Sequence, residues 1–125
     1  TRRPDQTHSE KLASLVTEKS QIIRACRLYL YEEMDKSPPT LARTAQAVGM
    51  TERTLRRRIR EEGTTFRAII EGLRKQLCGL YLAENKRSIE EIAQLLGYSE
   101  TSAFTRAHMR WYKVPPSRAR RPVMM

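Results

Sequence analysis

The sequence contains few of the residues that support catalysis or metal binding. Its two histidines, His8 and His108, and its two cysteines, Cys26 and Cys78, form neither a C-x-x-C nor an H-E-x-x-H motif. Cysteines without such spacing indicate small buried residues rather than zinc ligands or a disulfide framework. We therefore expect no enzyme activity, no cofactor and no metal site.

Long apolar runs are also missing. No stretch approaches the ~20 apolar residues that a membrane-spanning helix requires, and the first residues lack the pattern of a signal peptide. We therefore expect a cytoplasmic protein with no membrane partner. The chain starts at Thr1, and residues 1–19 resemble a linker or the end of a missing N-terminal effector or dimerisation domain. This start indicates a fragment of a longer protein.

Acidic residues are scarce relative to basic ones. The 125 residues include 24 Lys and Arg against 14 Asp and Glu, a formal net charge of +10. Such an excess in a short chain predicts a polyanionic partner. DNA or RNA is favoured, an anionic membrane surface is a weaker alternative, and a basic but merely soluble surface is the simplest one.

Glycine is scarce too, and the proline positions and apolar periodicity predict an all-helical fold, because no period-two alternation is long enough for a sheet. In the first helix Ile23, Cys26, Leu30 and Met34 form a one-sided apolar stripe, and the run over residues 37–39 (SPP) is expected to end it. Three upstream apolar residues either extend this helix or pack on a missing domain: Leu12, Leu15 and Val16.

A long amphipathic helix is predicted over residues 65–85 and would connect the two halves of the chain. Its apolar positions lie within about 120° of arc: Phe66, Ile69, Ile70, Leu73, Leu77, Leu80 and Tyr81. At 1.5 Å per residue this helix is about 30 Å long. Gly72 and Gly79 lie on one side of it, where we expect another helix to pack closely.

The most informative pattern is an internal repeat at an offset of 48 residues. Residues 45–52 (AQAVGMTE) align with residues 93–100 (AQLLGYSE), and six of the eight pairs are identical or exchange similar residues. Such repeats indicate duplicated supersecondary units, and each copy has the parts of a helix-turn-helix. Met50 and Tyr98 are the apolar residues expected to plug the corner between the two helices of each unit.

The residues around each corner predict how its helices end and begin. Gly49 or Gly97 supplies the positive φ of a sharp turn, and the hydroxyl of Thr51 or Ser99 is expected to cap the following helix. In the second unit, residues 88–91 (SIEE) also fit a capping box at the start of the preceding helix.

The second helix of the first unit has a core face and a basic face. Leu55 and Ile59 lie on one side. Four arginines lie within about 100° of arc on the other side: Arg53, Arg56, Arg57 and Arg60. Like charges on one face destabilise an isolated helix, and guanidinium groups suit both phosphate contact and reading of guanine O6 and N7 in the major groove. We therefore expect this face to contact nucleic acid.

The second helix of the second unit is expected to carry fewer basic residues on its outer face than the corresponding helix of the first unit. Phe104, Ala107, His108 and Trp111 are expected to be buried, with His108 as a packed or hydrogen-bonded core residue rather than a metal ligand or switch. The residues expected on the outer face combine hydroxyls with a few basic groups: Ser102, Thr105, Arg106, Met109 and Arg110. Hydroxyl and guanidinium groups together suit mixed base and phosphate contacts.

These motifs resemble those of the AraC family of transcription regulators over residues 20–121. The resemblance rests on residues 41–63 (LARTAQAVGMTERTLRRRIREEG), on the connecting helix and on residues 88–107 (SIEEIAQLLGYSETSAFTRA), followed by PPSR at residues 115–118. It implies a seven-helix domain with two helix-turn-helix subdomains bridged by a long helix. It also implies promoter binding, usually activation of transcription, and RNA polymerase as a partner. Lys113 departs from the pattern, because glycine is frequent there.

The expected organisation is a linker (residues 1–19), a first helix-turn-helix subdomain (20–64), the connecting helix (65–85) and a second subdomain (86–125). In the family, exposed residues early in each recognition helix read bases, and here these are Arg53, Arg56, Arg57, Thr101, Ser102, Thr105 and Arg106. The expected phosphate contacts lie around them: Thr51, Arg58, Arg60, Lys86, Arg87, Ser99, Arg110 and Lys113.

Successive major-groove segments on one face of B-DNA are about 34 Å apart, close to the length of the connecting helix. The sequence therefore predicts that one chain of a bacterial transcription regulator reads two adjacent segments of double-stranded DNA. One alternative is the DNA-binding module of a recombinase or transposase, although no catalytic Ser, Tyr or acidic cluster is visible. Another is a helical protein-interaction domain whose basic face meets an acidic partner.

Overall fold

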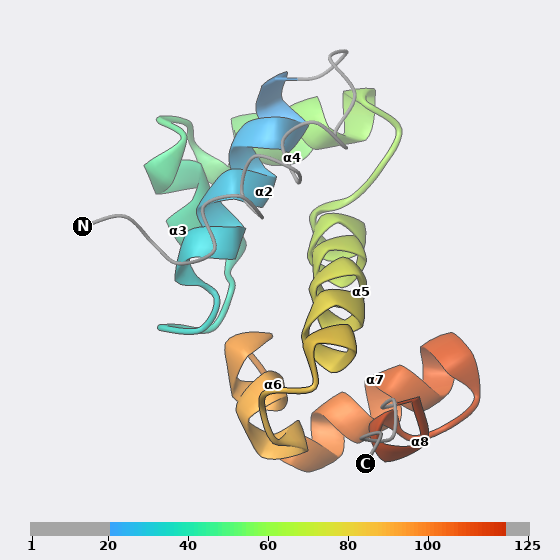
Figure 1. Cartoon of the computed structure of the whole chain (residues 1–125). Helices are drawn as coiled ribbons and strands as arrows, with labels where there is room; N and C mark the ends of the chain where they lie inside the picture. The colour runs from blue at the N-terminus through green and yellow to red at the C-terminus, as the bar shows by residue number, and fades with distance from the viewer. Residues whose placement is uncertain (1–20, 120–125) are drawn as a thin grey trace. The chain divides into compact units, whose positions relative to one another are not determined.

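A computed structural model describes residues 21–119, and the structural statements below concern these residues. It contains seven helices and no strand in this range (Figure 1), which confirms the expected all-helical fold. The helices are α2 (Gln21–Glu33), α3 (Leu41–Ala47), α4 (Glu52–Glu61), α5 (Phe66–Glu84), α6 (Ile89–Leu95), α7 (Thr101–Tyr112) and α8 (Pro116–Ala119). The linker expected over 1–19, with Leu12, Leu15 and Val16, lies outside the described residues.

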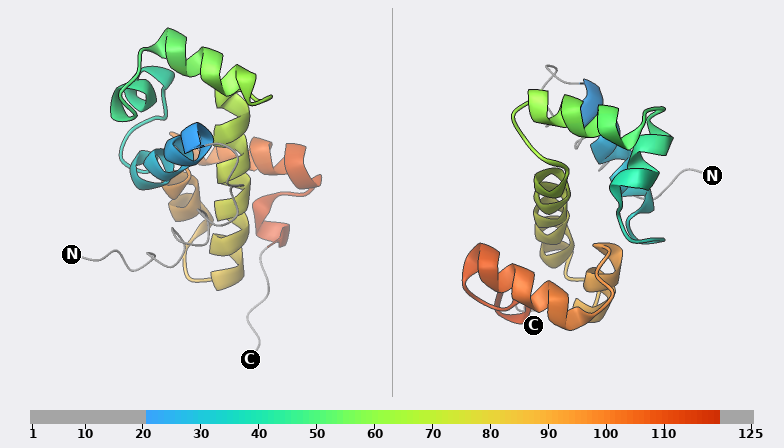
Figure 2. Two further views of the ribbon diagram at one scale, coloured as in Figure 1. Left: turned by 90° about the horizontal axis from the view of Figure 1, so that it is seen from above. Right: turned by 180° about the vertical axis from the view of Figure 1, so that it is seen from behind.

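The described residues divide into two compact units. The first contains α2, α3, α4 and the start of α5 up to Glu71, and the second contains the segment Met34–Pro38, α5 from Gly72 onward, and α6 to α8. In the first unit α2 packs against α3 and α4, and these two pack against each other (Figure 2). In the second unit α7 packs against both α6 and α8. None of the helices in residues 21–119 is long and apolar enough to cross a membrane.

Helix α2 buries Cys26 and Leu30 as expected, but its first buried residue is Ile22 instead of the expected Ile23. Ile22, Cys26 and Leu30 are buried, whereas Ile23, which the sequence placed in the core, is only half-buried. Two neighbouring residues of a helix point about 100° apart, so only one of the two isoleucines can face the core. The i, i+4, i+8 spacing from Ile22 brings three side chains onto one face, and this alignment selects Ile22.

The end of α2 also differs from the prediction. The helix ends at Glu33, ahead of the prolines that were expected to end it. Met34 is buried, as expected, but it lies beyond the helix and belongs to the second unit. Its backbone carbonyl and Cβ lie next to Gly97. Met34, the first residue after the helix, therefore contributes to the core of the second unit.

Helix α5 spans one residue less at each end than predicted. Four of the expected apolar residues are buried, and two more that the stripe did not include are buried with them: Ile69, Leu73, Leu77 and Tyr81, then Cys78 and Leu82. Phe66, Ile70 and Leu80 are half-buried. The expectation of close helix packing at the glycines is wrong, because Gly72 and Gly79 are exposed and no described atom lies within 4 Å of a Cβ added at Gly79.

The corners between the paired helices follow the repeat. After α3, the Gly49 amide donates to Gln46 O (3.2 Å) and the Met50 amide to Ala45 O (2.9 Å). After α6, the Gly97 and Tyr98 amides donate to the matching carbonyls of Gln94 and Ala93, each at 3.0 Å. Both glycines have the left-handed φ that this C-terminal motif requires, +75° at Gly49 and +87° at Gly97. The predicted turns are confirmed at both positions.

The helix caps confirm two of the predictions, at Thr51 and Ser88, and the structure adds a third cap at Thr40 that was not predicted. Thr40 and Thr51 accept hydrogen bonds from Arg43 N and Thr54 N, at 3.1 Å each. Ser88 forms the predicted capping box, since its Oγ accepts from Glu91 N (3.0 Å) while Glu91 Oε1 accepts from Ser88 N (2.8 Å). Each of these side chains satisfies an amide that the first turn leaves unpaired.

The predicted cap at Ser99 is wrong. Helix α7 begins at Thr101, its N-cap is Glu100, and no side chain makes the capping hydrogen bond. The N-cap follows the turn glycine by two residues in the first unit (Gly49 to Thr51) and by three in the second (Gly97 to Glu100). The second corner therefore contains one additional residue, which moves Ser99 out of the capping position.

Replacing Gly97 by alanine is expected to destabilise the fold more than the same change at Gly49. Both residues have a left-handed φ, so each alanine costs about 1–2 kcal/mol. At Gly97 the new Cβ also lies 2.9 Å from the backbone oxygen of Met34, whereas nothing in the described chain lies within 4 Å at Gly49. Overpacking adds about 1–3 kcal/mol to the loss at Gly97. Urea unfolding followed by circular dichroism measures both variants, and equal losses would contradict the close approach.

Candidate nucleic-acid interface

The orientation of the basic face of α4 is set by the apolar residues on its opposite face, which are buried. Leu55 and Ile59 are 0% and 1% exposed, and burial of each side chain contributes about 1.5–3 kcal/mol. The face opposite them is exposed and surrounds a hollow of about 530 Å³ lined by Arg53, Thr54, Arg56, Arg57 and Arg60. The four arginines expected to share a face therefore lie together. The Thr51 cap and the Gly49 turn set where this face begins.

The charge on this face is largely uncompensated. Arg57 Nε lies 3.5 Å from Glu61 Oε2, and both side chains are more than half exposed. The guanidinium groups of Arg53, Arg56 and Arg60 have no hydrogen bond or ion pair with the residues in 21–119. An exposed ion pair contributes about 0–1 kcal/mol, so Arg57 can exchange Glu61 for another anion. Four guanidinium groups are thus available to a polyanion.

Helix α7 presents its outer face in the same way but with different chemistry. Phe104, Ala107 and His108 are buried as expected, while Trp111 is half-buried rather than buried. Four of the residues predicted to face outward are exposed, namely Ser102, Arg106, Met109 and Arg110. Thr101 and Thr105, also predicted to contact bases, are half-buried. Met109 is 42% exposed.

The additional residue in the second corner changes which positions of α4 and α7 correspond. The N-caps, Thr51 and Glu100, are 49 residues apart, and so are the buried anchors, Leu55 with Phe104 and Ile59 with His108. At the same offset, the exposed arginines correspond as follows: Arg53 to Ser102, Arg56 to Thr105, Arg57 to Arg106 and Arg60 to Met109. The two recognition helices therefore align at 49 residues, although the helices before them align at 48.

Arg74 stabilises the corner between α6 and α7. This role was not predicted from the sequence. This side chain of α5 donates from Nε to Leu96 O (2.7 Å) and from Nη2 to Gly97 O (3.2 Å). Its guanidinium also lies over the ring of Tyr98, 4.2 Å from the centroid. A cation at the C-terminal end of a helix satisfies the last carbonyls and opposes the helix dipole. The available signal was a basic residue next to the apolar stripe of α5.

The end of α7 is held by His108. Its Nδ1 lies 2.6 Å from Val114 O, and because a carbonyl can only accept, Nδ1 carries the proton of this hydrogen bond. The ring is 0% exposed and lies against Tyr112 (4.9 Å between centroids), which confirms the expected packed histidine. Lys113 follows in the left-handed region, with φ 67°. The family frequently has glycine at this position, because glycine adopts a left-handed φ without strain.

The residues predicted to contact phosphate have different surroundings. Lys86, Ser99, Arg58, Arg110 and Lys113 are exposed. The Thr51 hydroxyl, besides capping α4, lies 3.0 Å from Thr54 Oγ1. Arg87 is committed to its own unit, since Nη1 lies 2.8 Å from Glu84 Oε1 and the guanidinium lies over the ring of Tyr81, 5.0 Å from its centroid. Among these candidates, Arg87 must break a local contact before it can bind a phosphate.

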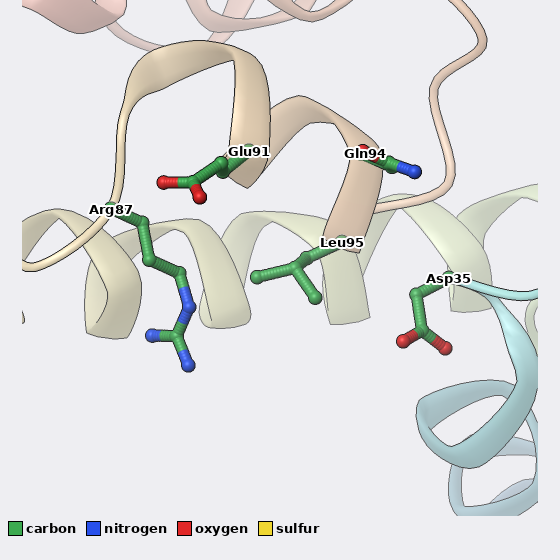
Figure 3. A pocket seen from close by; sticks show the side chains of 5 residues that line it. All are labelled: Asp35, Arg87, Glu91, Gln94 and Leu95. Atoms are coloured by element: carbon green, nitrogen blue, oxygen red, sulfur yellow. The ribbon is translucent and has the colours of Figure 1, made fainter.

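A hollow of about 250 Å³ lies beside α6 in the second unit (Figure 3). Glu91, Gln94 and Leu95 come from α6, Arg87 from the loop before it and Asp35 from the segment after α2. Arg87 is paired with Glu84, and the Glu91 carboxylate accepts from the Ser88 amide. Two of the charged lining groups, Arg87 and Glu91, are thus engaged in local contacts.

The two cysteines are buried and free. Burial raises the pKa of the thiols of Cys26 and Cys78 to about 11, because the charged thiolate is poorly solvated there. Both thiols stay protonated at neutral pH, as expected for small core residues. No group of three or more potential metal ligands occurs among residues 21–119.

Known proteins share this arrangement. A family model described as a helix-turn-helix domain matches residues 44–122. The transcriptional regulator VqsM of Pseudomonas aeruginosa is 41% identical over 73 residues, which are 58% of this chain and 22% of VqsM. The transcriptional activator CfaD of Escherichia coli is 36% identical over 77 residues, 62% of this chain and 29% of CfaD. The crystal structure of the regulator CdpR from Pseudomonas aeruginosa superimposes with a TM-score of 0.70 and 30% identity, covering 93% of this chain and 39% of CdpR.

Two helix-turn-helix units that expose basic second helices define a DNA-binding protein of the transcription-regulator class. The chain belongs to the AraC family of these regulators and binds double-stranded DNA sequence-specifically. The family and these relatives are regulators and not enzymes. The chain spans less than a third of the length of the two curated relatives, 22% and 29%.

Removal of the Arg74 guanidinium is expected to loosen the second corner. Arg74→Met leaves the carbonyls of Leu96 and Gly97 without their donor, and hydrogen bonds to charged groups contribute about 1.5–3 kcal/mol. We expect a loss of that size in the free energy of unfolding, measured by urea denaturation. Arg67→Met on the same helix is the control, because Arg67 is exposed and its loss should change stability by less than about 0.5 kcal/mol. An unchanged free energy of unfolding for Arg74→Met would disprove this role.

Proposed function

We propose that α4 and α7 of this chain read two adjacent major-groove segments of a promoter. The observation that carries the proposal is the pair of helix-turn-helix units, each of which buries one side of its second helix and exposes the other. The 19 residues of α5 correspond to about 28 Å at 1.5 Å per residue. Successive major-groove segments on one face of B-DNA are about 34 Å apart.

The proposed base contacts are made early in each recognition helix. They are the residues expected from the sequence: Arg53, Arg56, Arg57, Thr101, Ser102, Thr105 and Arg106. The proposed phosphate contacts surround them and include Arg60, Arg58, Lys86, Arg110 and Lys113. Free guanidinium groups on α4 support direct readout by the first unit, because an arginine without an internal partner loses no protein contact when it binds a base.

The whole regulator is proposed to contain a further domain, N-terminal to this chain, which senses an effector or dimerises. The small share of VqsM and CfaD that the chain spans supports such a domain. The name of CfaD as an activator supports activation, with RNA polymerase as partner, and bacterial DNA lies in the cytoplasm, where the protein is expected to act. Membership of a family of regulators favours this role over a recombinase or transposase module.

Arg57→Ala is expected to weaken specific DNA binding by about 1–3 kcal/mol and to relax the preference at one base pair. Lys86→Ala is the matched comparison, because a lost phosphate contact weakens all sequences evenly and lowers the slope of log K against log salt by about 1. Fluorescence anisotropy with specific and random duplexes at several salt concentrations measures both. Equal losses on the two duplexes for Arg57→Ala would remove it from the base-reading set.

The footprint on a selected site tests the proposed function as a whole. Hydroxyl-radical cleavage is expected to be suppressed in two patches on one face of the duplex, one helical turn apart. Arg106→Ala should weaken the protection of one patch and leave the other. Protection of a single groove by the wild-type chain would overturn the two-groove proposal. Failure to select any duplex from a random pool would instead favour the protein-interaction alternative.

A further inference from the structure

We infer that the second unit contains a binding site for one small, uncharged aromatic molecule that carries a hydrogen-bond donor, such as an indole or a phenol. The site is a hollow of about 260 Å³ between α5, α7 and α8, lined by Cys78, Gly79, Leu82, Ala83, His108, Tyr112 and Ala119. All of these residues belong to the second unit. None of them is a proposed DNA contact, so the inference does not depend on the proposed function.

The hollow has a buried floor and a rim that is open to solvent. Cys78, Leu82 and His108 are buried, whereas the other four lining residues are exposed. Gly79 leaves space above the helix, because no described atom lies within 4 Å of a Cβ added there. An apolar cavity of about 150 Å³ is large enough to bind benzene. The larger hollow therefore has room for a molecule with two fused rings, which would enter from the exposed side.

His108 contributes an unsatisfied hydrogen-bond acceptor to this floor. Its Nδ1 donates to Val114 O, so Nδ1 carries the proton of the neutral ring and Nε2 keeps a lone pair. Nε2 is buried and has no hydrogen-bond partner among residues 21–119. A second proton on Nε2 would leave an unpaired charge in the core, which is more costly than an unpaired acceptor. A ligand with an N–H or O–H group satisfies this acceptor, whereas a ligand without one does not.

Tyr112 controls access to this acceptor. Nε2 is covered in the free chain, so a donor reaches it only when a lining side chain moves. The Tyr112 ring lies 4.9 Å from the His108 ring, between centroids, and Tyr112 is 46% exposed. Its recorded contacts within the described residues involve the ring and include no hydrogen bond. Tyr112 can therefore turn to another staggered rotamer, and an aromatic ligand then replaces its ring against His108.

The lining favours an uncharged ligand. Burial raises the pKa of the Cys78 thiol to about 11. Burial also raises the pKa of the Tyr112 phenol, and the neighbouring Cys78 raises it further. Both groups are therefore neutral at pH 7, and a charged ligand would lose its hydration without gaining a counter-charge from the lining. Lys75 Nζ, which lies 5.4 Å from the centroid of the Tyr112 ring, disfavours a cation in particular.

A pair of matched probes tests the inference. Indole and 1-benzofuran have the same size and shape, but indole has a ring N–H where benzofuran has an oxygen that cannot donate. Titrations of the whole chain, followed by the backbone amide signals in NMR spectra, give both dissociation constants. We expect indole to bind about 2- to 10-fold more tightly, the factor that one net hydrogen bond supplies. Equal affinities would overturn the role of the acceptor, and no binding of either probe would overturn the site.

The imidazole nitrogens report directly on the contact with His108. The His8→Gln variant leaves His108 as the only histidine of the chain, so its ring signals are assigned without ambiguity after nitrogen-15 labelling of histidine. Saturation with indole is expected to move the Nε2 signal upfield, because Nε2 then accepts a hydrogen bond, whereas saturation with benzofuran should leave it close to its position in the free chain. An unmoved Nε2 signal in the indole complex would contradict the inference.

Substitution of Gly79 locates the bound probe. Gly79→Leu places a side chain in the hollow and is expected to weaken indole binding about tenfold or more, whereas Gly79→Ala adds one methyl group to open space and should change it less than about threefold. Both variants replace a helical glycine, which favours α5, and circular dichroism checks their fold. Unchanged indole affinity in Gly79→Leu would show that indole binds elsewhere and would overturn the inference. Both variants should bind DNA as the wild type does, so this result leaves the proposed function intact.

Discussion

The left-handed corner between the paired helices is the constraint on which the rest of the structure depends. At Gly49 and Gly97 the chain adopts φ values of +75° and +87°, and the following amide bonds back to the carbonyl five residues earlier. This geometry ends the first helix and turns the chain toward the second, whose N-cap follows two residues after Gly49 and three residues after Gly97. Only glycine adopts it without strain, so the repeated glycine is the clearest trace of the fold in the sequence.

The two corners are held by different means. In the first unit the space around Gly49 is open, and the cap at Thr51 begins α4 directly. In the second, Gly97 lies against the Met34 backbone, and Arg74 binds the last carbonyls of α6. The second recognition helix lacks a side-chain cap. Contacts distant in sequence therefore replace, in the second unit, a local hydrogen bond that positions α4 in the first.

Sequence reasoning succeeded where local pattern determines structure and failed where distant contacts do. Periodicity located the helices, and the faces of α4 followed from Leu55 and Ile59. Ser99 was assigned as a cap because capping preference is local, whereas the register of α7 is set by the burial of Phe104 and His108. The role of Arg74 could not be predicted from local pattern, because its hydrogen-bond partners lie 22 and 23 residues away. The base contacts themselves remain predictions.

The arginine face of α4 is costly to the helix that carries it. Like charges three and four residues apart destabilise a helix by about 0.2–0.5 kcal/mol per pair, and the one nearby acid, Glu61, reaches only Arg57. Burial of Leu55 and Ile59 and the Thr51 cap offset this cost. Because α7, on the same framework, needs only one arginine at these positions, the fold does not require the other three. Their repulsion falls when phosphates approach, so the relief of this repulsion adds to the binding energy that phosphate neutralisation supplies.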